Sequence, residues 1–470
     1  MGTSTMKGSS DVLVGLQYGD EGKARIIDML AKDYEVIARF NGGANAGHTI
    51  ETEHGRIALH QIPSGVFYPD MLLYIGSGCV VNIEKLVHEI KDVNRLGIDL
   101  TNRLHISSQS TLIQPHHLII DELSDQVIGT TRNGIGPAYS DRAMRMDGER
   151  LLHIRLGDFL DNPSEVLGQV EKNLLHVVKS CDLNNVDTNI MQKFDDALSA
   201  ITPYVEIDTM FMDKLARSGK RIMFEGAQSF MLDVVKGTIP YVTSSHTVTS
   251  HAYTGGDLSL GFHRKTIGVA KAIMSRVGYG PFVSEFGGED SERYCMEQDG
   301  RTHSKEYESH LDVQRFLKSS NMLDIGIALR IIGNEYGVAT GRPRRIGMMD
   351  IVQLAYAARM NGVDELAINK CDMLRDFSET ALGGIPIVNK YSLHGQTIDY
   401  VPASSHTYKQ VASSHLILDP FEQDISTITE YNHLPKPAKN FVRMVESALD
   451  CKVIGLGVGP KRDQYVVKSG

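Results

Sequence analysis

Residues 11–25, DVLVGLQYGDEGKAR, decide how the rest of the chain is interpreted. Residues 12–14 are a short apolar run typical of a buried strand, and the glycines that follow permit a tight turn. Apolar residues return at helical spacing from Ile26. A strand, a glycine turn and a helix start form an anion site, because free backbone N–H groups and the positive helix end point to one spot. Lys23 adds a full positive charge to this site.

This turn differs from the standard phosphate-binding loop. Six residues, rather than the usual four, separate Gly15 from Gly22, and Ala24 stands where that loop has its Mg²⁺-binding hydroxyl. The carboxylates of Asp20 and Glu21 would repel a bare phosphate, so they indicate a bound cation or the removal of a proton from a substrate. A solvated charged turn is the alternative for this motif taken alone.

The bulk composition is that of a soluble globular enzyme. The chain has 470 residues, of which 41% are hydrophobic and 23% charged, with a net charge of -10. The acidic balance argues against nucleic-acid binding, and no apolar run is long enough to predict a membrane span. The five cysteines are scattered without a C-x-x-C pair, which favours a reducing compartment. We therefore expect a cytoplasmic protein with a disordered segment at 1–10 and one α/β domain over 11–470.

Two polar loops follow in the first third of the chain. The stretch 41–49, NGGANAGHT, carries Asn45 and His48 on a glycine-rich loop that can close over a ligand, although a lone surface histidine is common. In the stretch 129–145, Thr130, Thr131, three glycines and Pro137 predict an irregular loop that is followed by Arg142 and Arg145. Paired hydroxyls ahead of arginines suit a phosphate monoester. An exposed basic turn is the alternative for this second loop.

Further candidates lie later in the chain. A strand predicted at 221–224 ends abruptly, which places Gln228 where it can bind a purine edge, and Thr243 can hold a phosphate. The stretch 337–352 places Arg342, Arg344 and Arg345 in one turn, either as an anion clamp or as a solvated basic turn. Residues 150–220 and 285–336 are predicted to be helical excursions without a recognisable site.

The stretch 365–374, ELAINKCDML, predicts a strand that ends in N-K-x-D. Asp372 can accept both the N1–H and the 2-amino hydrogens of guanine while the Lys370 stem lies along the ring. Adenine has no such pair of donors, so the motif favours guanine, although four letters also occur by chance. A last strand and glycine turn at 452–464 can complete the base pocket.

Together these stretches resemble the adenylosuccinate synthetase family. The motifs QYGDEGK, NAGHT, IPSG, GTT-x-x-GIGPAY, FEGAQ, GT-x-P-x-VTSS, TGRPRR, NKCD and GVGP occur in the family's order over nearly the whole chain. The resemblance implies a single large α/β domain around a mostly parallel central sheet with helical excursions. It also implies a homodimer in which Arg145 reaches the partner's site.

The resemblance implies a ligase of purine nucleotide biosynthesis that joins L-aspartate to C6 of IMP. GTP is the co-substrate, a 6-phosphoryl intermediate forms, and the products are adenylosuccinate, GDP and phosphate. Asp20 would remove the N1 proton so that O6 attacks the γ-phosphate, and His48 would stabilise the transferring phosphoryl group. Mg²⁺ would be held by the Asp20 carboxylate and the Gly47 carbonyl.

Carried over residue by residue, the resemblance implies four overlapping sets of site residues. The catalytic set is Asp20, Lys23, His48 and Gln228. The IMP set is Asp20, Glu21, Gly22, Lys23, Asn45, Ala46, Gly47, His48, Thr131, Arg145, Gln228, Thr243 and Arg342. The GTP set is Gly19, Asp20, Glu21, Gly22, Lys23, Gly47, His48, Thr49, Arg344, Lys370, Cys371, Asp372, Gly457, Val458 and Gly459. The aspartate set is Ala339, Thr340, Gly341, Arg342 and Arg344.

Some positions depart from the family pattern. Ala339 replaces a threonine of the aspartate loop, and Val235 and Ile239 replace an acidic and an aromatic residue beside the expected nucleotide contacts. These changes leave open the same chemistry on dGMP, and a separate alternative is a GTP-binding paralogue without catalysis. The retained Asp20 places IMP ahead of dGMP, and Asp20 and His48 together argue against a silent paralogue.

Overall fold

The computed structural model describes residues 8–45, 48–52, 55–128, 132–184, 186–296, 303–337 and 341–468, with 48–52, 55–57 and 125–128 as backbone only. The chain divides into two compact units. Unit 1 consists of Met1–Leu13, Ala24–Ala227 and Thr243–Lys265, and unit 2 of Val14–Lys23, Gln228–Val242 and Thr266–Gly470. No helix in the described ranges combines the length and the apolar composition needed to cross a membrane.

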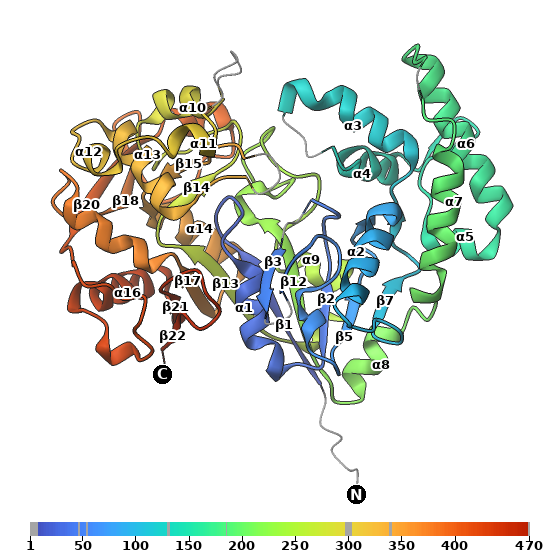
Figure 1. Ribbon diagram of the computed structural model, residues 1–470, viewed down its shortest axis with the longest axis horizontal. Coiled ribbons are helices and arrows are strands. Elements are labelled where there is room, and N and C mark those ends of the chain that lie inside the picture. Colours follow the sequence, from blue (N-terminus) through green and yellow to red (C-terminus); the bar gives the residue numbers. More distant parts are fainter. Residues whose placement is uncertain are drawn as a thin grey trace, which may run out of the picture. The chain divides into compact units, whose positions relative to one another are not determined.

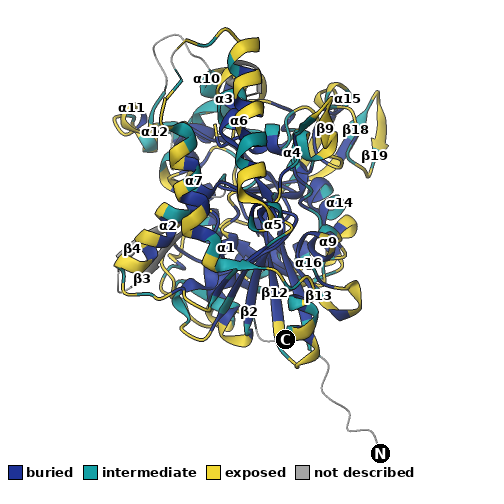
Figure 2. Cartoon of the chain, turned by 90° about the vertical axis from the view of Figure 1, so that its right-hand side faces the viewer, coloured by how far each residue is buried: buried dark blue, intermediate teal, exposed yellow. Residues whose placement is uncertain are grey.

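Unit 1 is built on a mostly parallel sheet with the strand order β11-β7-β5-β2-β12-β1 (Figure 1). The strands are β1 (Ser9–Gly15), β2 (Val36–Arg39), β5 (Leu72–Ile75), β7 (Leu104–Ser107), β11 (Val205–Glu206) and β12 (Arg221–Ser229). Parallel strands are covered on both faces, which explains why residues 12–14 are all apolar and at most 1% exposed. Figure 2 shows β2 and β12 as buried strands.

The helices of unit 1 lie in the crossovers and in the first excursion. They are α1 (Lys23–Leu30), α2 (Ile83–Arg95), α3 (Pro115–Ile128), α4 (Ile135–Met144), α5 (Leu156–Asp161), α6 (Pro163–Ser180), α7 (Ile190–Ile201), α8 (Phe211–Arg217) and α9 (His251–Gly255). Helix α6 begins after the Asn162 cap with Pro163 in its first turn. It packs against α3 and α5, while α7 packs against α2.

Unit 2 contains parallel strands β13 (His263–Lys271), β17 (Glu365–Asn369) and β21 (Lys452–Gly457), with β22 (Tyr465–Val467) antiparallel to β21. A second sheet joins β16 (Met349–Asp350), β18 (Ile385–Leu393), β19 (Gln396–Ile398) and β20 (Ala412–Leu418). Strands β14 (Met274–Arg276) and β15 (Arg345–Gly347) form an antiparallel pair. The helices are α10 (Gly288–Met296), α11 (Lys305–Glu308), α12 (Val313–Leu317), α13 (Met322–Gly333), α14 (Ile351–Asn361), α15 (Ser405–Lys409) and α16 (Lys436–Leu449).

The expected α/β class with a mostly parallel sheet is confirmed, and so are the strands predicted around residues 12–14 and 365–369. The predicted end of the strand at residue 224 is wrong, because β12 continues to Ser229. The reason is that the Asn41 side chain makes the hydrogen bonds to β12 that a neighbouring strand would otherwise make. The Asn41 amide accepts from the Ala227 N–H at 2.8 Å and donates to the Ala227 carbonyl at 3.1 Å.

Two predicted loops also contain regular structure. Residues 135–144 form α4 instead of an irregular loop, since Gly134 with φ 71° turns the chain into the helix and its carbonyl accepts from the Ala138 N–H. His48 is the first residue of β3 (His48–Thr52), which pairs antiparallel with β4 (Gly55–Leu59), so it lies on a strand and not on a loop.

The close approach of two backbones at Gly78 gives a test of the packing of unit 1. A Cβ at Gly78 would lie 2.1 Å from the Phe40 carbonyl oxygen and 2.6 Å from the Gly255 Cα. We expect Gly78→Ala to lower the free energy of unfolding by about 1–3 kcal/mol, as overpacking does. In contrast, a Cβ at Gly168 in the middle of α6 meets open space. We therefore expect Gly168→Ala to raise the free energy of unfolding by about 0.5–1 kcal/mol. Urea unfolding of both variants is the measurement, and equal effects would contradict this packing.

Candidate active site

The QYGDEGK segment forms a sharp turn between β1 and α1. Its backbone adopts positive φ at Gly19 (97°), Asp20 (57°) and Gly22 (83°). A Cβ at Gly22 would lie 2.8 Å from the Asn369 Nδ2 atom, and that amide donates to the Glu21 carbonyl at 2.6 Å. The turn is therefore fixed against the end of β17, where the NKCD motif begins.

Glu21 organises this turn from inside. Its side chain is fully buried and accepts from the Gly19 N–H at 2.9 Å, from the Lys23 ammonium at 2.9 Å and from the Ser229 hydroxyl at 2.5 Å. Burial alone would raise the pKa of Glu21, but the Lys23 charge and the Ser229 hydroxyl hold that pKa below its ordinary value. Glu21 was assigned to the ligand contacts from the sequence, but in the structure its carboxylate is a buried anion that stabilises the turn.

Asp20 is the carboxylate that the turn presents outward. Its side chain is 46% exposed, and one of its oxygens forms an ion pair at 2.9 Å with the Arg344 guanidinium. A non-glycine residue at positive φ is held in a strained conformation, which is common where a side chain must be aimed. An exposed carboxylate in this position suits proton transfer or the binding of a hard cation.

Arg344 belongs to a cluster of charges in unit 2. Glu335 is 4% exposed and lies 2.7 Å from an Arg344 Nη atom, 3.2 Å from the Lys271 Nζ atom and 3.6 Å from the Lys370 Nζ atom. Burial would raise the pKa of Glu335, but these three cations hold it far below its ordinary value. Neither Glu335 nor Lys271 was predicted from the sequence, since both lie outside the recognised motifs.

The three arginines of TGRPRR have different environments. Arg344 is buried within the cluster, and Arg342 is exposed. The prediction that Arg345 shares an anion clamp is wrong, because Arg345 is buried in β15 and bound by two carboxylates. Its guanidinium donates to Glu285 at 2.9 Å and to Glu292 at 3.1 Å. Gly341 has φ 63°, while Ala339 and Thr340 lie outside the described residues.

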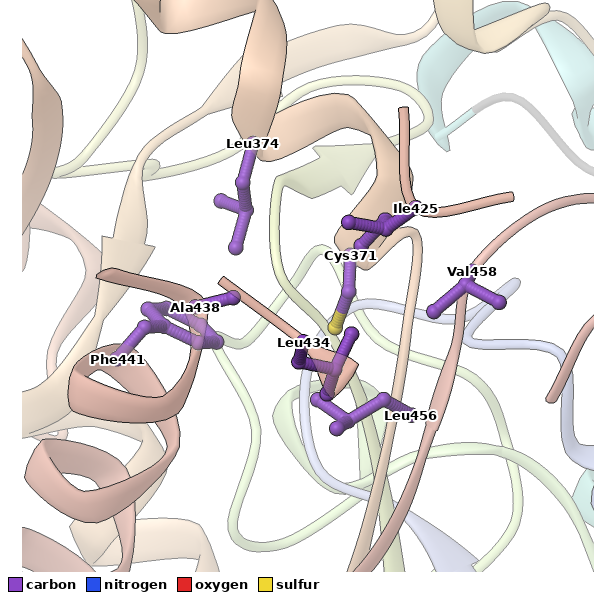
Figure 3. A pocket seen from close by; sticks show the side chains of 8 residues that line it. All are labelled: Cys371, Leu374, Ile425, Leu434, Ala438, Phe441, Leu456 and Val458. Atoms are coloured by element: carbon purple, nitrogen blue, oxygen red, sulfur yellow. The ribbon is translucent and has the colours of Figure 1, made fainter. Parts of the chain in front are cut away.

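The NKCD motif leaves the end of β17 with a sharp change of direction. Lys370 has φ 63°, and its ammonium donates to the Gly333 carbonyl at 2.6 Å. Cys371 and Val458 do not face solvent, since both line a small apolar cavity with Leu434 and Leu456 (Figure 3). Burial raises the pKa of the Cys371 thiol well above its ordinary value, which leaves it a packing group. The Asp372 side chain is half-buried, between the core and solvent.

Between β21 and β22, Gly457 ends β21 and Gly459 follows in the turn. A Cβ at Gly459 would lie 2.4 Å from the Gln464 side-chain oxygen, so only glycine fits this turn without a shift. Gln228, at the end of β12, has φ 55°, and its buried amide oxygen accepts no hydrogen bond. An unsatisfied buried acceptor costs free energy, which makes this oxygen a candidate ligand contact.

The remaining predicted residues lie in unit 1 or outside the description. Asn45 accepts from the Gly43 N–H at 3.3 Å, Thr243 is half-buried, and Arg145 is exposed at the end of α4 with φ 66°. His48 and Thr49 are described as backbone in β3. Ala46, Gly47 and Thr131 lie outside the described residues.

Among the side chains that the structure describes, His116, His117 and Asp141 offer ligand atoms close enough to suggest a metal centre. Both histidine Nε2 atoms lie 3.0 Å from one Asp141 oxygen. However, the Gln114 N–H donates to His117 Nδ1 at 3.0 Å, which places the ring proton on Nε2 and directs it to Asp141. Burial lowers the pKa of His117 to about 4. Burial would raise the pKa of Asp141, but the hydrogen bonds from His116 and His117 hold it well below its ordinary value, so hydrogen bonding between an ionised carboxylate and two imidazoles accounts for this group without a metal.

The buried pair of Glu21 and Lys23 gives a prediction about the turn. Glu21→Gln leaves the Lys23 ammonium buried without its partner charge, so we expect the free energy of unfolding to fall by about 3–5 kcal/mol. Asp92→Asn removes one carboxylate from an ion pair whose side chains are 55% and 76% exposed, and it should change stability far less. Urea unfolding at neutral pH compares the two, and equal losses would contradict the central position of Glu21.

Comparison with known proteins places these features in a family. The family model for adenylosuccinate synthetase matches residues 12–466. Adenylosuccinate synthetase 2 of Cupriavidus pinatubonensis is 43% identical, with 99% of this chain and 98% of that protein covered. Adenylosuccinate synthetase of Pelodictyon phaeoclathratiforme is 34% identical, with 98% of each chain covered.

Solved structures give the same result. A fully ligated adenylosuccinate synthetase from Plasmodium falciparum has a TM-score of 0.83 and 30% identity, covering 98% of this chain and all of that chain. A succinoaminodeoxyadenylate synthetase of cyanophage S-2L, bound to dGMP and dATP, has a TM-score of 0.59 over 98% of this chain and 95% of that chain. Its 18% identity shows a shared fold only. The sequence resemblance is confirmed, and the chain belongs to the adenylosuccinate synthetase family.

Proposed function

We propose that this protein is a GTP-dependent ligase that joins L-aspartate to C6 of IMP, giving adenylosuccinate, GDP and phosphate. Family membership supports the reaction class, a carbon–nitrogen ligation in purine biosynthesis. The observation that carries the proposal is the exposed Asp20 carboxylate, which lies at a strained turn beside Arg344. A base and a cation at one position suit the transfer of a phosphoryl group to an oxygen that must first lose a proton.

In the proposed reaction, Asp20 takes the N1 proton of IMP, and the electron pair moves to O6. O6 then attacks the γ-phosphorus of GTP, and the bond to the β-phosphate oxygen breaks to release GDP. The aspartate amine attacks C6 and loses one proton to solvent, the C6–O6 bond breaks, and phosphate leaves with that oxygen. Phosphoryl transfer needs positioning and charge stabilisation more than covalent help, and Asp20 fits the first proton transfer.

Lys23, His48 and Gln228 are proposed to complete the catalytic set. Lys23 is 5% exposed at the start of α1, and its ammonium is fixed by the Glu21 carboxylate at 2.9 Å. The imidazole of His48 is assigned to the transferring phosphoryl group by the family motif alone. The unsatisfied amide oxygen of Gln228 suits a hydrogen bond from the purine base.

Mg²⁺ is the metal that this reaction class requires, and Asp20 and Gly47 are its proposed ligands. The exposed carboxylate of Asp20 fits such a hard cation, which prefers oxygen donors. When bound, the ion neutralises charge on the phosphates. Asp20 itself holds the proton taken from N1.

The GTP and aspartate contacts are proposed from the NKCD, GVGP and TGRPRR motifs. Asp372 accepts from the guanine N1–H and 2-amino groups, with Lys370 along the ring and Gly459 at its edge. Arg342 and Arg344, together with Thr340, bind the carboxylates of L-aspartate. The exposed Arg342 and the fixed guanidinium of Arg344 support this assignment, because arginine pairs with carboxylates through two parallel hydrogen bonds.

A cytoplasmic homodimer in which Arg145 reaches the partner's site belongs to the same proposal. Arg145 is exposed, and its neighbours Met144 and Met146 are 57% and 52% exposed. Two large apolar side chains beside an exposed arginine are typical of a surface that a partner covers.

The experiment that tests the proposal is an assay with GTP, L-aspartate and either IMP, GMP or dGMP. We expect phosphate and the 6-succinylamino product to form with IMP, and phosphate release to require all three substrates. A preference for dGMP would transfer the same chemistry to the alternative purine. GTP hydrolysis without IMP and aspartate would indicate a GTP-binding protein and contradict the ligase.

Asp20→Asn tests the proton transfer. The amide keeps the shape of the side chain and one acceptor oxygen for Arg344 but takes up no proton, so we expect turnover to fall by about 10²–10⁴-fold. IMP binding, measured by calorimetry, should remain close to that of the unchanged protein. Turnover near the original rate would remove Asp20 from the mechanism.

Asp372→Asn tests guanine recognition. It replaces an acceptor of two guanine hydrogens with an amide that accepts one, so kcat/KM for GTP should fall by about 10²-fold or more while kcat/KM for IMP at saturating GTP stays similar. ITP lacks the 2-amino group and should lose less in the variant than GTP does. An unchanged preference for GTP over ITP would contradict the role of Asp372.

A further inference from the structure

Glu335 is a buried carboxylate on which three segments of unit 2 converge. It follows α13 by two residues, and it binds Lys271 at the end of β13, Arg344 before β15 and Lys370 after β17. The side chain is 4% exposed, and its contacts with Lys271 and Arg344 form away from water, whereas the Lys370 side chain is 33% exposed. Ion pairs in such surroundings are strong only when their geometry is fixed.

The backbone also fixes Glu335 relative to Arg344. The Arg344 N–H donates to the Glu335 carbonyl at 3.0 Å, and Tyr336 and Pro343 form an antiparallel bridge beside it. The guanidinium then divides its donors between two carboxylates, 2.7 Å from Glu335 and 2.9 Å from Asp20. Arg344 is therefore held on one side by Glu335 while its other side reaches Asp20.

The charges of this cluster are unequal. Lys271, Arg344 and Lys370 supply three positive charges, while Glu335 and Asp20 supply two negative ones, so one positive charge is left over. Lys271 is 1% exposed and also donates to Ser275, whose hydroxyl bonds Glu335 at 3.1 Å. An excess positive charge in a fixed arrangement attracts an anionic ligand without rearrangement.

We propose that Glu335 is a positioning residue that orients Arg344 for the aspartate carboxylate and Lys370 for the guanine nucleotide at the same time. Glu335 touches neither ligand and acts through these two cations. Since one carboxylate holds both, the loss of its charge disturbs two binding sites that the motifs treat as separate. The inference rests on the proposed function, from which the ligands of Arg344 and Lys370 are taken.

The test is Glu335→Gln in the full-length protein. GDP binding is measured by calorimetry, and the KM for aspartate is measured at saturating IMP and GTP. We expect the Kd for GDP and the KM for aspartate each to rise by about tenfold or more, as loss of one partner of a buried charge pair does, while the KM for IMP changes less than about threefold. Glu335→Asp keeps the charge on a shorter stem and should recover part of both losses.

A second variant covers the case in which Glu335→Gln does not fold. Glu335→Gln combined with Lys271→Met removes one charge of each sign and keeps the net charge of the cluster. It still lacks the carboxylate that orients Arg344 and Lys370, so the same two losses are expected.

Asp11→Asn is the matched control for removing a buried carboxylate. Asp11 is 1% exposed and accepts from Arg264 at 2.8 Å within unit 1. Asp11→Asn should lower the melting temperature without raising the Kd for GDP or the KM for aspartate. The inference would be overturned if the Kd for GDP and the KM for aspartate were unchanged in the folded Glu335 variants. It would also be overturned if both constants rose equally in Asp11→Asn. Failure of the unchanged protein to bind GDP or to form product would instead contradict the proposed function.

Discussion

The guanidinium of Arg344, held between Glu335 and Asp20, is the interaction on which the candidate site depends. One carboxylate is buried and the other is 46% exposed, so the arginine joins the interior of unit 2 to a surface group. A buried ion pair adds little net stability, but it fixes the orientation of its side chains. Phosphoryl transfer requires reacting groups that are held in a fixed orientation. The ion pair with Arg344 also fixes where the Asp20 carboxylate lies.

Buried polar and charged contacts also fix the turn that carries Asp20. Glu21 uses its carboxylate to satisfy backbone N–H groups, Lys23 and Ser229, and the Asn369 amide fixes the Glu21 carbonyl. Two adjacent carboxylates thus differ in position, since Glu21 is buried and shapes the turn while Asp20, the proposed base, is 46% exposed. The strained φ of Asp20 is maintained because these contacts surround it.

Local patterns in the sequence were sufficient to predict the strand, turn and helix around Asp20 and the strand that ends in NKCD. Apolar runs and glycines determine structure over only a few residues, so they can be recognised locally. Long-range contacts were not predictable in this way. Glu335 stands in a charged stretch that looked like a helical excursion, and only the fold brings it to Arg344 and Lys370. Arg345 shares a motif with Arg344, yet Glu285 and Glu292 bind it in the interior. The extension of β12 likewise depends on Asn41, which is 186 residues away in sequence.

The central claim is that a purine oxygen, freed by proton transfer to Asp20, receives the γ-phosphoryl group. The most direct test is turnover with IMP that carries ¹⁸O at position 6, followed by mass spectrometry of the released phosphate. If O6 attacks the γ-phosphorus and the C6–O6 bond then breaks, the label appears in phosphate in a one-to-one ratio with the product. Unlabelled phosphate formed together with the ligated product would contradict the claim.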